Sequence, residues 1–127
     1  VGRMRGIDRT ALVTDSNRAL DMAPGEYVFG PQQGGVTIVS DGNVGWTSDR
    51  SALASSVRGM DFMVRQMHQV IGLNLPAAVR MASLTPARIL GLDHDIGSIT
   101  VGKRADLLLL DQDLRVAGVW RRGNRVV

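Results

Sequence analysis

An aspartate follows directly after a short apolar run near the start of the sequence. Residues 11–14 have the composition of a strand buried on both faces of a parallel sheet, and Asp15 comes next. Active sites of parallel α/β folds lie at the carboxyl ends of strands, so Asp15 could bind a metal, abstract a proton or orient a water molecule. The alternative is an Asx-turn, in which the carboxylate accepts a hydrogen bond from the backbone two residues on. The turn preferences of Asp and Asn favour that alternative.

A second charged group lies just before the longest predicted helix. Arg50 follows Asp49 ahead of residues 51–71. An arginine near a helix N-terminus can bind an anion together with the free backbone N–H groups of the first turn. The alternative is a solvent-exposed pair between Asp49 and Arg50, and composition alone favours it slightly.

Other metal-binding residue types are few. The sequence has two histidines and no cysteine, so this chain alone cannot form a hydrolytic zinc site rich in histidine. His68 falls beside the apolar stripe of the long helix, which is typical of a helix-surface residue. His94 lies between Asp93 and Asp95, but metal ligands normally converge from several elements rather than from one turn.

Hydrophobic periodicity and turn residues predict the elements that position these groups. Apolar residues spaced by three or four predict a helix over residues 51–71. Shorter helices are predicted over residues 74–83 and from Thr85, as the N-cap, to Gly91. The predicted strands are residues 11–14, 26–29, 36–40, 98–101, 107–110, 116–120 and 125–127.

Composition argues against several classes of protein. The chain has 127 residues, 44% of them hydrophobic, which suits one domain with a modest core. A net charge of only +3, dispersed basic residues and 4% aromatic residues argue against nucleic-acid binding. The apolar runs are too short to cross a bilayer, which argues against a membrane protein. The absence of cysteine favours a cytoplasmic location.

Several segments together resemble a known family. MASLTPARILGL (residues 81–92) and GSITVGKRADLLLLD (residues 97–111) resemble the end of the metal-dependent amidohydrolase superfamily. Within it, LVTDSN (residues 12–17), the helix that includes SSVRGMDFMVRQM, and the closing VAGVWRRGNRVV (residues 116–127) are similar to N-acetylglucosamine-6-phosphate deacetylases. The resemblance covers essentially the whole chain but only about the last third of such an enzyme.

The resemblance implies an α/β fold that is the C-terminal part of a (β/α)8 TIM-barrel amidohydrolase, with strands of its attached small β-sandwich. Residues 1–96 would be the last strand, a hairpin insertion and the C-terminal helices of the barrel domain. Residues 97–127 would be the C-terminal strands of the β-sandwich domain. Because the barrel would be incomplete, we expect association with the missing barrel portion or a homo-oligomer such as a dimer.

The resemblance also implies a reaction: hydrolysis of the acetamide bond of N-acetylglucosamine 6-phosphate, giving glucosamine 6-phosphate and acetate. Asp15 would be the catalytic carboxylate, which takes a proton from a metal-bound water and delivers one to the leaving amine. The phosphorylated amino-sugar substrate would contact Ser48, Asp49, Arg50 and Ser51. Relatives usually carry a leucine-alanine/serine-glycine-serine stretch there, so the charged pair is a departure from the family.

The implied cofactor is a divalent metal, zinc or similar, in the intact enzyme. Its ligands would lie upstream of residue 1, with Asp15 as the one residue of this chain that could join them. The isolated chain is therefore predicted to be inactive. Two alternatives stay open: an amidohydrolase acting on another substrate (a cyclic amide, or a deaminase), and a noncatalytic β-rich assembly module.

Overall fold

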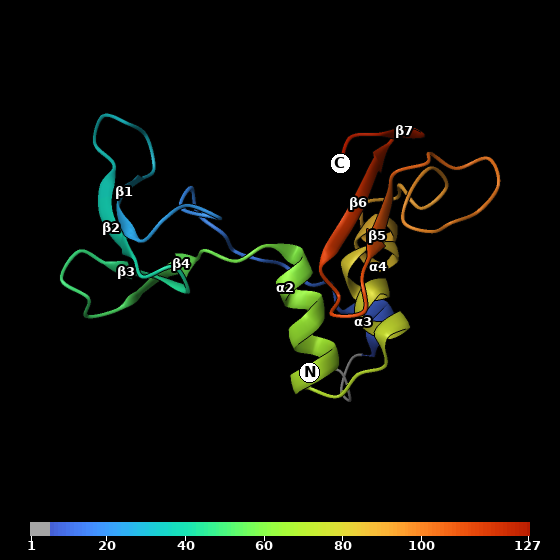
Figure 1. The fold of residues 1–127 in the computed structure, drawn as a ribbon, viewed down its shortest axis with the longest axis horizontal. Helices are drawn as coiled ribbons and strands as arrows, with labels where there is room; N and C mark the ends of the chain where they lie inside the picture. The colour runs from blue at the N-terminus through green and yellow to red at the C-terminus, as the bar shows by residue number, and fades with distance from the viewer. Residues whose placement is uncertain (1–5) are drawn as a thin grey trace. The chain divides into compact units, whose positions relative to one another are not determined.

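A computed structural model describes residues 6–127, which form two compact units of mixed α/β structure (Figure 1). One unit comprises residues 14–60, and the other comprises residues 61–127 together with the described residues before 14. Residues 97–127 thus share a unit with the helices that precede them. The boundary expected at residue 96, between a barrel and a sandwich, stays a prediction.

The unit of residues 14–60 is built on a four-stranded antiparallel sheet in the order β1-β2-β3-β4. The strands are β1 (Gly25–Phe29), β2 (Val36–Ser40), β3 (Val44–Thr47) and β4 (Leu53–Ser56). Ile38 and Ser40 of β2 are 1% and 2% exposed, so the core of this unit lies on one face of that strand. The hairpin predicted over residues 26–29 and 36–40 is confirmed.

Asp41 organises the turn between β2 and β3. Its Oδ1 accepts hydrogen bonds from the backbone N–H groups of Asn43 and Val44, both at 2.8 Å, and its Oδ2 accepts one from Trp46 Nε1 at 3.0 Å. Three donors stabilise the ionised carboxylate, with Trp46 contributing most, and they lower the Asp41 pKa from 3.8 to about 2.

The long helix predicted over residues 51–71 is wrong in its first part. Residues 53–56 form strand β4, and the helix α2 (Met60–Arg65) begins only after Gly59. Ser55 has φ 82°, which no right-handed helix accommodates, and Ser56 Oγ accepts a hydrogen bond from Arg58 N at 3.0 Å. The helical spacing of Leu53, Val57 and Met60 was coincidental, because Leu53 pairs across the sheet with Trp46.

After α2 the helix widens into a π-helical segment, η2 (Gln66–Val70). Ile71 N donates to Gln66 O at 3.1 Å, a spacing of five residues. The imidazole Nδ1 of His68 lies 2.7 Å from the Leu73 carbonyl oxygen just beyond this segment. His68 is therefore engaged by the chain that follows its own helix.

The helical part of the second unit consists of the short 3-10 turn η1 (Ile7–Arg9), α3 (Leu75–Ala82) and α4 (Leu84–Ile89). The Asn74 side chain caps α3 by accepting a hydrogen bond from Ala77 N at 2.9 Å. Thr85, predicted as the cap of α4, instead lies inside that helix. It is 1% exposed and donates from Oγ1 to the Ile7 carbonyl at 2.9 Å.

The strand predicted over residues 11–14 is not observed. Leu12 N donates to the Met81 carbonyl, at the end of α3, at 2.9 Å, and Val13 is 76% exposed. A strand requires a neighbouring strand to accept its backbone bonds, and no strand in the described range lies beside this segment. The apolar composition of residues 11–14 predicts burial, but it does not show whether a partner strand is present.

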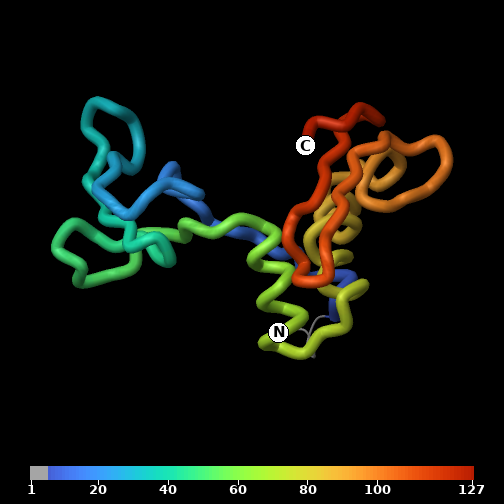
Figure 2. Tube along the Cα trace, in the orientation of Figure 1, coloured from blue at the N-terminus to red at the C-terminus, as the bar shows by residue number. Residues whose placement is uncertain are grey.

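A three-stranded antiparallel sheet ends the chain, with β5 (Leu107–Leu110), β6 (Val116–Arg121) and β7 (Asn124–Arg125) in that order. Strands near residues 107–110 and 116–120 were predicted and are confirmed, and the last strand begins one residue early and ends sooner. The strand predicted over residues 98–101 is wrong. This segment belongs to the long connection between α4 and β5, drawn in orange in Figure 2.

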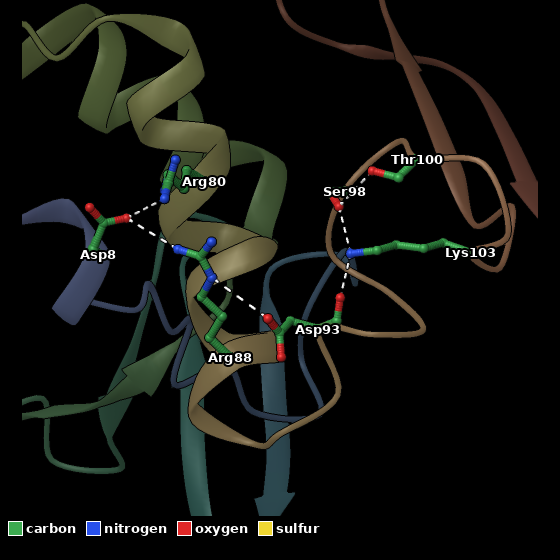
Figure 3. Close-up of polar contacts among 7 residues, drawn as sticks. All are labelled: Asp8, Arg80, Arg88, Asp93, Ser98, Thr100 and Lys103. Atoms are coloured by element: carbon green, nitrogen blue, oxygen red, sulfur yellow. Dashed lines mark hydrogen bonds and ion pairs between the residues drawn. The ribbon is translucent and has the colours of Figure 1, made fainter.

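Polar contacts hold this connection against the helices (Figure 3). Lys103 Nζ donates to the Asp93 carbonyl and, at 2.7 Å, to Ser98 Oγ, which folds the loop back on itself. Arg88 of α4 lies 3.6 Å from Asp8 and 3.7 Å from Asp93, and Arg80 of α3 lies 2.6 Å from Asp8. These partly exposed pairs orient the elements more than they stabilise them.

Gly97 should be intolerant of substitution. It has φ 89°, and a Cβ there would lie 2.8 Å from Ala87 Cβ on α4. Gly97→Ala should lower the free energy of unfolding by about 2–4 kcal/mol, from left-handed strain plus overpacking. Urea unfolding measures this loss of stability. Trp120 fluorescence in a Trp46→Phe background reports only on the unit of residues 61–127, which contains Gly97.

The matched control is Gly102→Ala. Gly102 has φ 91° but nothing within 4 Å of the added Cβ, so only the strain of about 1–2 kcal/mol should appear. Equal losses for the two variants would show that the contact of Gly97 with α4 has no energetic role.

The Asp41 turn predicts a pH dependence. The folded pKa of about 2 lies below the ordinary 3.8, so the stabilisation is fully present above about pH 4 and is lost as pH falls through 2. NMR titration of the Asp41 carboxyl carbon should give the low midpoint, and the Trp46 indole N–H shift should follow it. Trp46→Phe removes the largest contribution and should raise the midpoint toward 3.8; an unchanged midpoint would contradict this cause.

Candidate active site

The backbone at Asp15 is fixed from across its unit. The Asp15 carbonyl oxygen accepts a hydrogen bond from Ser56 N at 2.9 Å and another from the Ser55 hydroxyl. The Ser56 carbonyl in turn accepts from Asn17 N at 2.9 Å, and Ser16 forms a parallel bridge with Ser56. Residues 15–17 therefore lie as a short parallel partner beside the end of β4.

This arrangement excludes the Asx-turn that local preferences favoured for Asp15. The donor such a turn would use, Asn17 N, is engaged by Ser56. The Asx-turn is instead made by Asn17, whose Oδ1 accepts from Ala19 N at 2.8 Å while its Nδ2 donates to the Ala54 carbonyl at 3.1 Å. Asn17 is 7% exposed and serves the fold.

The Asp15 side chain itself is exposed. Across residues 6–127 no hydrogen bond or ion pair engages its carboxylate. Asp15 has φ 49°, a left-handed conformation that a residue with a Cβ adopts at a cost. The Asp15 carboxylate is therefore open to solvent, on a backbone conformation that side-chain sterics disfavour.

The predicted substrate residues lie in the turn between β3 and β4 rather than ahead of a helix. Asp49 accepts from Thr47 Oγ1 at 2.6 Å, from Ser51 N at 3.1 Å and from Ser51 Oγ at 2.8 Å. These bonds, with Thr47 contributing most, lower the Asp49 pKa from 3.8 to about 2. The Asp49 carboxylate and the Ser51 hydroxyl are thus used in closing the hairpin.

Arg50 lies at the tip of the same turn. It has φ 57°, its N–H donates to the Thr47 carbonyl at 2.8 Å, and its side chain is exposed. The surface ion pair with Asp49 is absent, and within the described part of the chain no hydrogen bond or ion pair engages the Arg50 guanidinium. This cation remains available to an anionic group.

Asp15 is not brought into hydrogen-bonding contact with this turn in the described structure. Its hydrogen-bonded neighbours are Ser55 and Ser56, which were not predicted as site residues. A signal for them was present. The leucine-alanine/serine-glycine-serine stretch of the family matches residues 53–56, Leu-Ala-Ser-Ser, better than residues 48–51. The glycine position of that stretch is Ser55, whose φ of 82° is a conformation that favours glycine.

The family-like motif near residue 103 has structural roles. Lys103 closes its loop, and Arg104 N donates to the Asp95 carbonyl at 2.9 Å. Asp106 Oδ1 accepts from Arg122 N at 2.8 Å, which joins the start of β5 to the β6–β7 turn. The carboxylates of Asp93 and Asp95 pair with arginines, so the turn containing His94 is held by ion pairs.

No group of three His, Cys, Asp or Glu side chains that could hold a metal ion occurs within residues 6–127. The residues described therefore do not fit a complete metal site. No helix among these residues is both long and apolar enough to span a membrane.

The chain is similar to known proteins over most of its length. A model of the amidohydrolase family matches residues 8–126. The N-acetylgalactosamine-6-phosphate deacetylase of Escherichia coli O157:H7 is 36% identical over 91% of this chain, and the human N-acetylglucosamine-6-phosphate deacetylase is 34% identical over 91%. The chain spans 29% and 27% of the lengths of these two relatives.

A solved structure gives the same result. An aspartate-to-alanine mutant of N-acetyl-D-glucosamine-6-phosphate deacetylase from Mycobacterium smegmatis, in complex with N-acetyl-D-glucosamine-6-phosphate, superimposes with a TM-score of 0.88 and 34% identity. It covers 99% of this chain, which spans 32% of that protein. The match of fold and sequence over nearly all of these residues shows that the chain belongs to the amidohydrolase family.

Proposed function

We propose that the intact protein containing this chain hydrolyses the acetamide bond of N-acetylglucosamine 6-phosphate to give glucosamine 6-phosphate and acetate. The observation that carries the proposal is Asp15: a carboxylate with no partner in the described structure, on a backbone fixed by Ser55 and Ser56. Relatives at 34% identity are named for this activity, and the solved relative was obtained with this substrate.

In the proposed reaction Asp15 acts as general base and then as general acid. Its carboxylate takes a proton from the water that attacks the acetamide carbonyl, and it delivers a proton to the nitrogen as the C–N bond breaks. Its exposure keeps the carboxylate accessible to substrate. The intact enzyme would also hold the divalent metal of the family, with ligands that the described residues of this chain do not supply by themselves.

We assign the sugar phosphate group to Arg50. A guanidinium can bind phosphate through two parallel hydrogen bonds, and no carboxylate of the described residues forms an ion pair with this one, although Asp41 attracts it at longer range. Ser48 lies in the same turn, which the hydrogen bonds of Asp49 with Thr47 and Ser51 close. Residues 53–56, which match the small family stretch, are proposed as the second substrate-contacting segment.

The architecture expected for the intact protein is part of the proposal. Residues 1–96 would complete a TIM barrel and residues 97–127 a small β-sandwich, in a cytoplasmic enzyme. Leu107, Leu108 and Leu109 of β5 are 37%, 55% and 52% exposed. This apolar surface supports association with the remainder of the barrel protein or with a second copy.

A second candidate substrate is the galacto epimer, N-acetylgalactosamine 6-phosphate. The Escherichia coli relative at 36% identity is named for it. Both epimers present the same acetamide and phosphate, so Asp15 and Arg50 would have the same roles with either.

Replacing Asp15 tests the acid–base role. In the intact protein, Asp15→Asn should lower kcat by about 10²- to 10⁴-fold, because the amide cannot accept the proton. Steady-state kinetics with both epimeric sugar phosphates measures this and identifies the preferred substrate. Asp21→Asn is the matched control, since Asp21 is also exposed, left-handed at φ 58° and in the same unit. Full activity of Asp15→Asn would reject the assignment.

Arg50→Gln tests phosphate recognition. The variant should raise KM for the phosphorylated sugar by about 10- to 100-fold, the loss of a charge-assisted pair, and leave turnover of the unphosphorylated sugar unchanged. Arg122→Gln is the control, because Arg122 is another exposed arginine with φ 51° in a hairpin turn. Equal effects on phosphorylated and unphosphorylated sugars would show that Arg50 does not bind the phosphate.

A further inference from the structure

The turn that follows Asp15 carries an exposed arginine, Arg18, on a fixed backbone. Asn17 is 7% exposed, and its Oδ1 accepts a hydrogen bond from Ala19 N at 2.8 Å. Ala19 is 1% exposed, and Leu20 N donates to the Asn17 carbonyl at 3.2 Å. Arg18 is thus held between two buried neighbours. Because the chain from Asp15 to Arg18 spans at most about 11 Å, one sugar phosphate can reach both side chains.

One hydrogen bond orients the Arg18 side chain. Its Nη2 donates at 2.7 Å to the carbonyl oxygen of Gly30, which lies in the loop between β1 and β2. A single acceptor occupies one N–H of a guanidinium, whose donors form two edges with a parallel pair of N–H groups each. One complete edge therefore remains for a ligand. The bond to Gly30 has also reduced the conformational freedom that anion binding would otherwise remove.

The charge of Arg18 is not neutralised by the fold. The unit of residues 14–60 contains five carboxylates, yet within the described residues none forms an ion pair with Arg18. A neutral carbonyl is its hydrogen-bond acceptor instead. Of the two other arginines in the unit, Arg58 donates to the Asn43 side chain, and Arg50 lies at the tip of the β3–β4 turn.

This unit needs more than one cation to bind a phosphate group. A phosphate monoester carries about 1.5 to 2 negative charges at pH 7, which a single guanidinium does not balance. Three arginines and five carboxylates also give residues 14–60 a net charge of −2, which repels an anion. Arg50 by itself would therefore leave the bound phosphate with uncompensated charge, and Arg18 has a free edge to supply the rest.

We propose that Arg18 is a second phosphate-binding residue, which uses its free guanidinium edge to bind the phosphate monoester of the substrate on which Asp15 acts. The proposal rests on the proposed function, because that function supplies the substrate, but it does not depend on the assignment of Arg50. Arg18 takes no part in proton transfer. Inorganic phosphate has the same chemistry as the monoester, so the test includes both.

Kinetics of two variants of the intact protein test this role. Arg18→Gln removes the charge and the parallel donors, so it should raise KM for the sugar phosphate by about 10- to 100-fold. The effect should be confined to the phosphorylated sugar. Arg18→Lys keeps the charge but not the parallel pair, so its KM should lie between those of Arg18→Gln and the unchanged protein. Arg115→Gln, at an exposed arginine of the other unit, is the control.

A merely structural bond between Arg18 and Gly30 predicts different results. Loss of that bond alone would lower the urea midpoint and would impair turnover of the phosphorylated and unphosphorylated sugars equally. Arg18→Lys, which can still donate to the Gly30 carbonyl, would then restore both. This combination of results would overturn phosphate binding by Arg18.

Binding measured without turnover supplies an independent readout. In an Asp15→Asn host, which should not consume the sugar phosphate, isothermal titration calorimetry measures Kd for the sugar phosphate and for inorganic phosphate. Adding Arg18→Gln should weaken sugar-phosphate binding by about 10- to 100-fold. A loss for the sugar phosphate alone identifies the substrate as the source of the phosphate, and a parallel loss for inorganic phosphate shows that the free ion is bound as well. Unchanged Kd values for both would overturn the proposal.

The outcomes separate the two proposals. If Asp15→Asn is inactive and Arg18→Gln binds both ligands normally, the role of Arg18 is wrong and the acid–base role stands. If Asp15→Asn remains active, the proposed function fails. Inorganic phosphate, which the enzyme does not consume, then still decides whether Arg18 binds this group.

Discussion

The pairing of residues 15–17 with the end of β4 is the constraint on which the candidate site depends. Two backbone hydrogen bonds of 2.9 Å, from Ser56 N to Asp15 and from Asn17 to Ser56, join segments that are distant in the sequence. Gly45 makes room for this pairing, because a Cβ there would lie 2.8 Å from Asn17 Nδ2. Since the Asp15 carbonyl and the Asn17 N–H are satisfied in this way, the Asp15 carboxylate is not needed to close the turn.

Charged residues of this unit include some that close turns and others whose charged group has no partner among the described residues. Asp41 and Asp49 accept three or more hydrogen bonds each from their own hairpins, and both have a pKa lowered to about 2. Asp15 and Arg50 have left-handed backbones, exposed side chains and, among the described residues, no hydrogen-bonded or ion-paired partner for the charged group. The first pair closes turns, whereas the charged groups of the second pair are not used by the fold of the described residues.

The wrong helix prediction shows why hydrophobic spacing alone could not separate the charged residues that close turns from those without a partner. Leu53, Val57 and Met60 have helical spacing, yet Leu53 pairs with Trp46 and only Met60 begins the helix. A spacing of three to four residues cannot exclude a short strand followed by a turn, because only a neighbouring strand distinguishes them. That error placed Ser48–Ser51 before a helix and left Ser55 and Ser56 without a role.

The sequence by itself determined the family, the hairpin of β1 and β2 and the terminal strands β5 and β6, and only the resemblance to that family pointed to Asp15 as an acid–base residue. The hairpin and strands depend on local turn chemistry and strand alternation, and the family depends on motifs in several segments, all of which can be read along the chain. Tertiary structure alone decided that Asp15 is not in an Asx-turn, that Asp49 closes a hairpin, and that Ser55 binds the Asp15 carbonyl. Each of these is a choice among competing hydrogen-bond partners. When a partner lies forty residues away, only the folded chain brings it within reach.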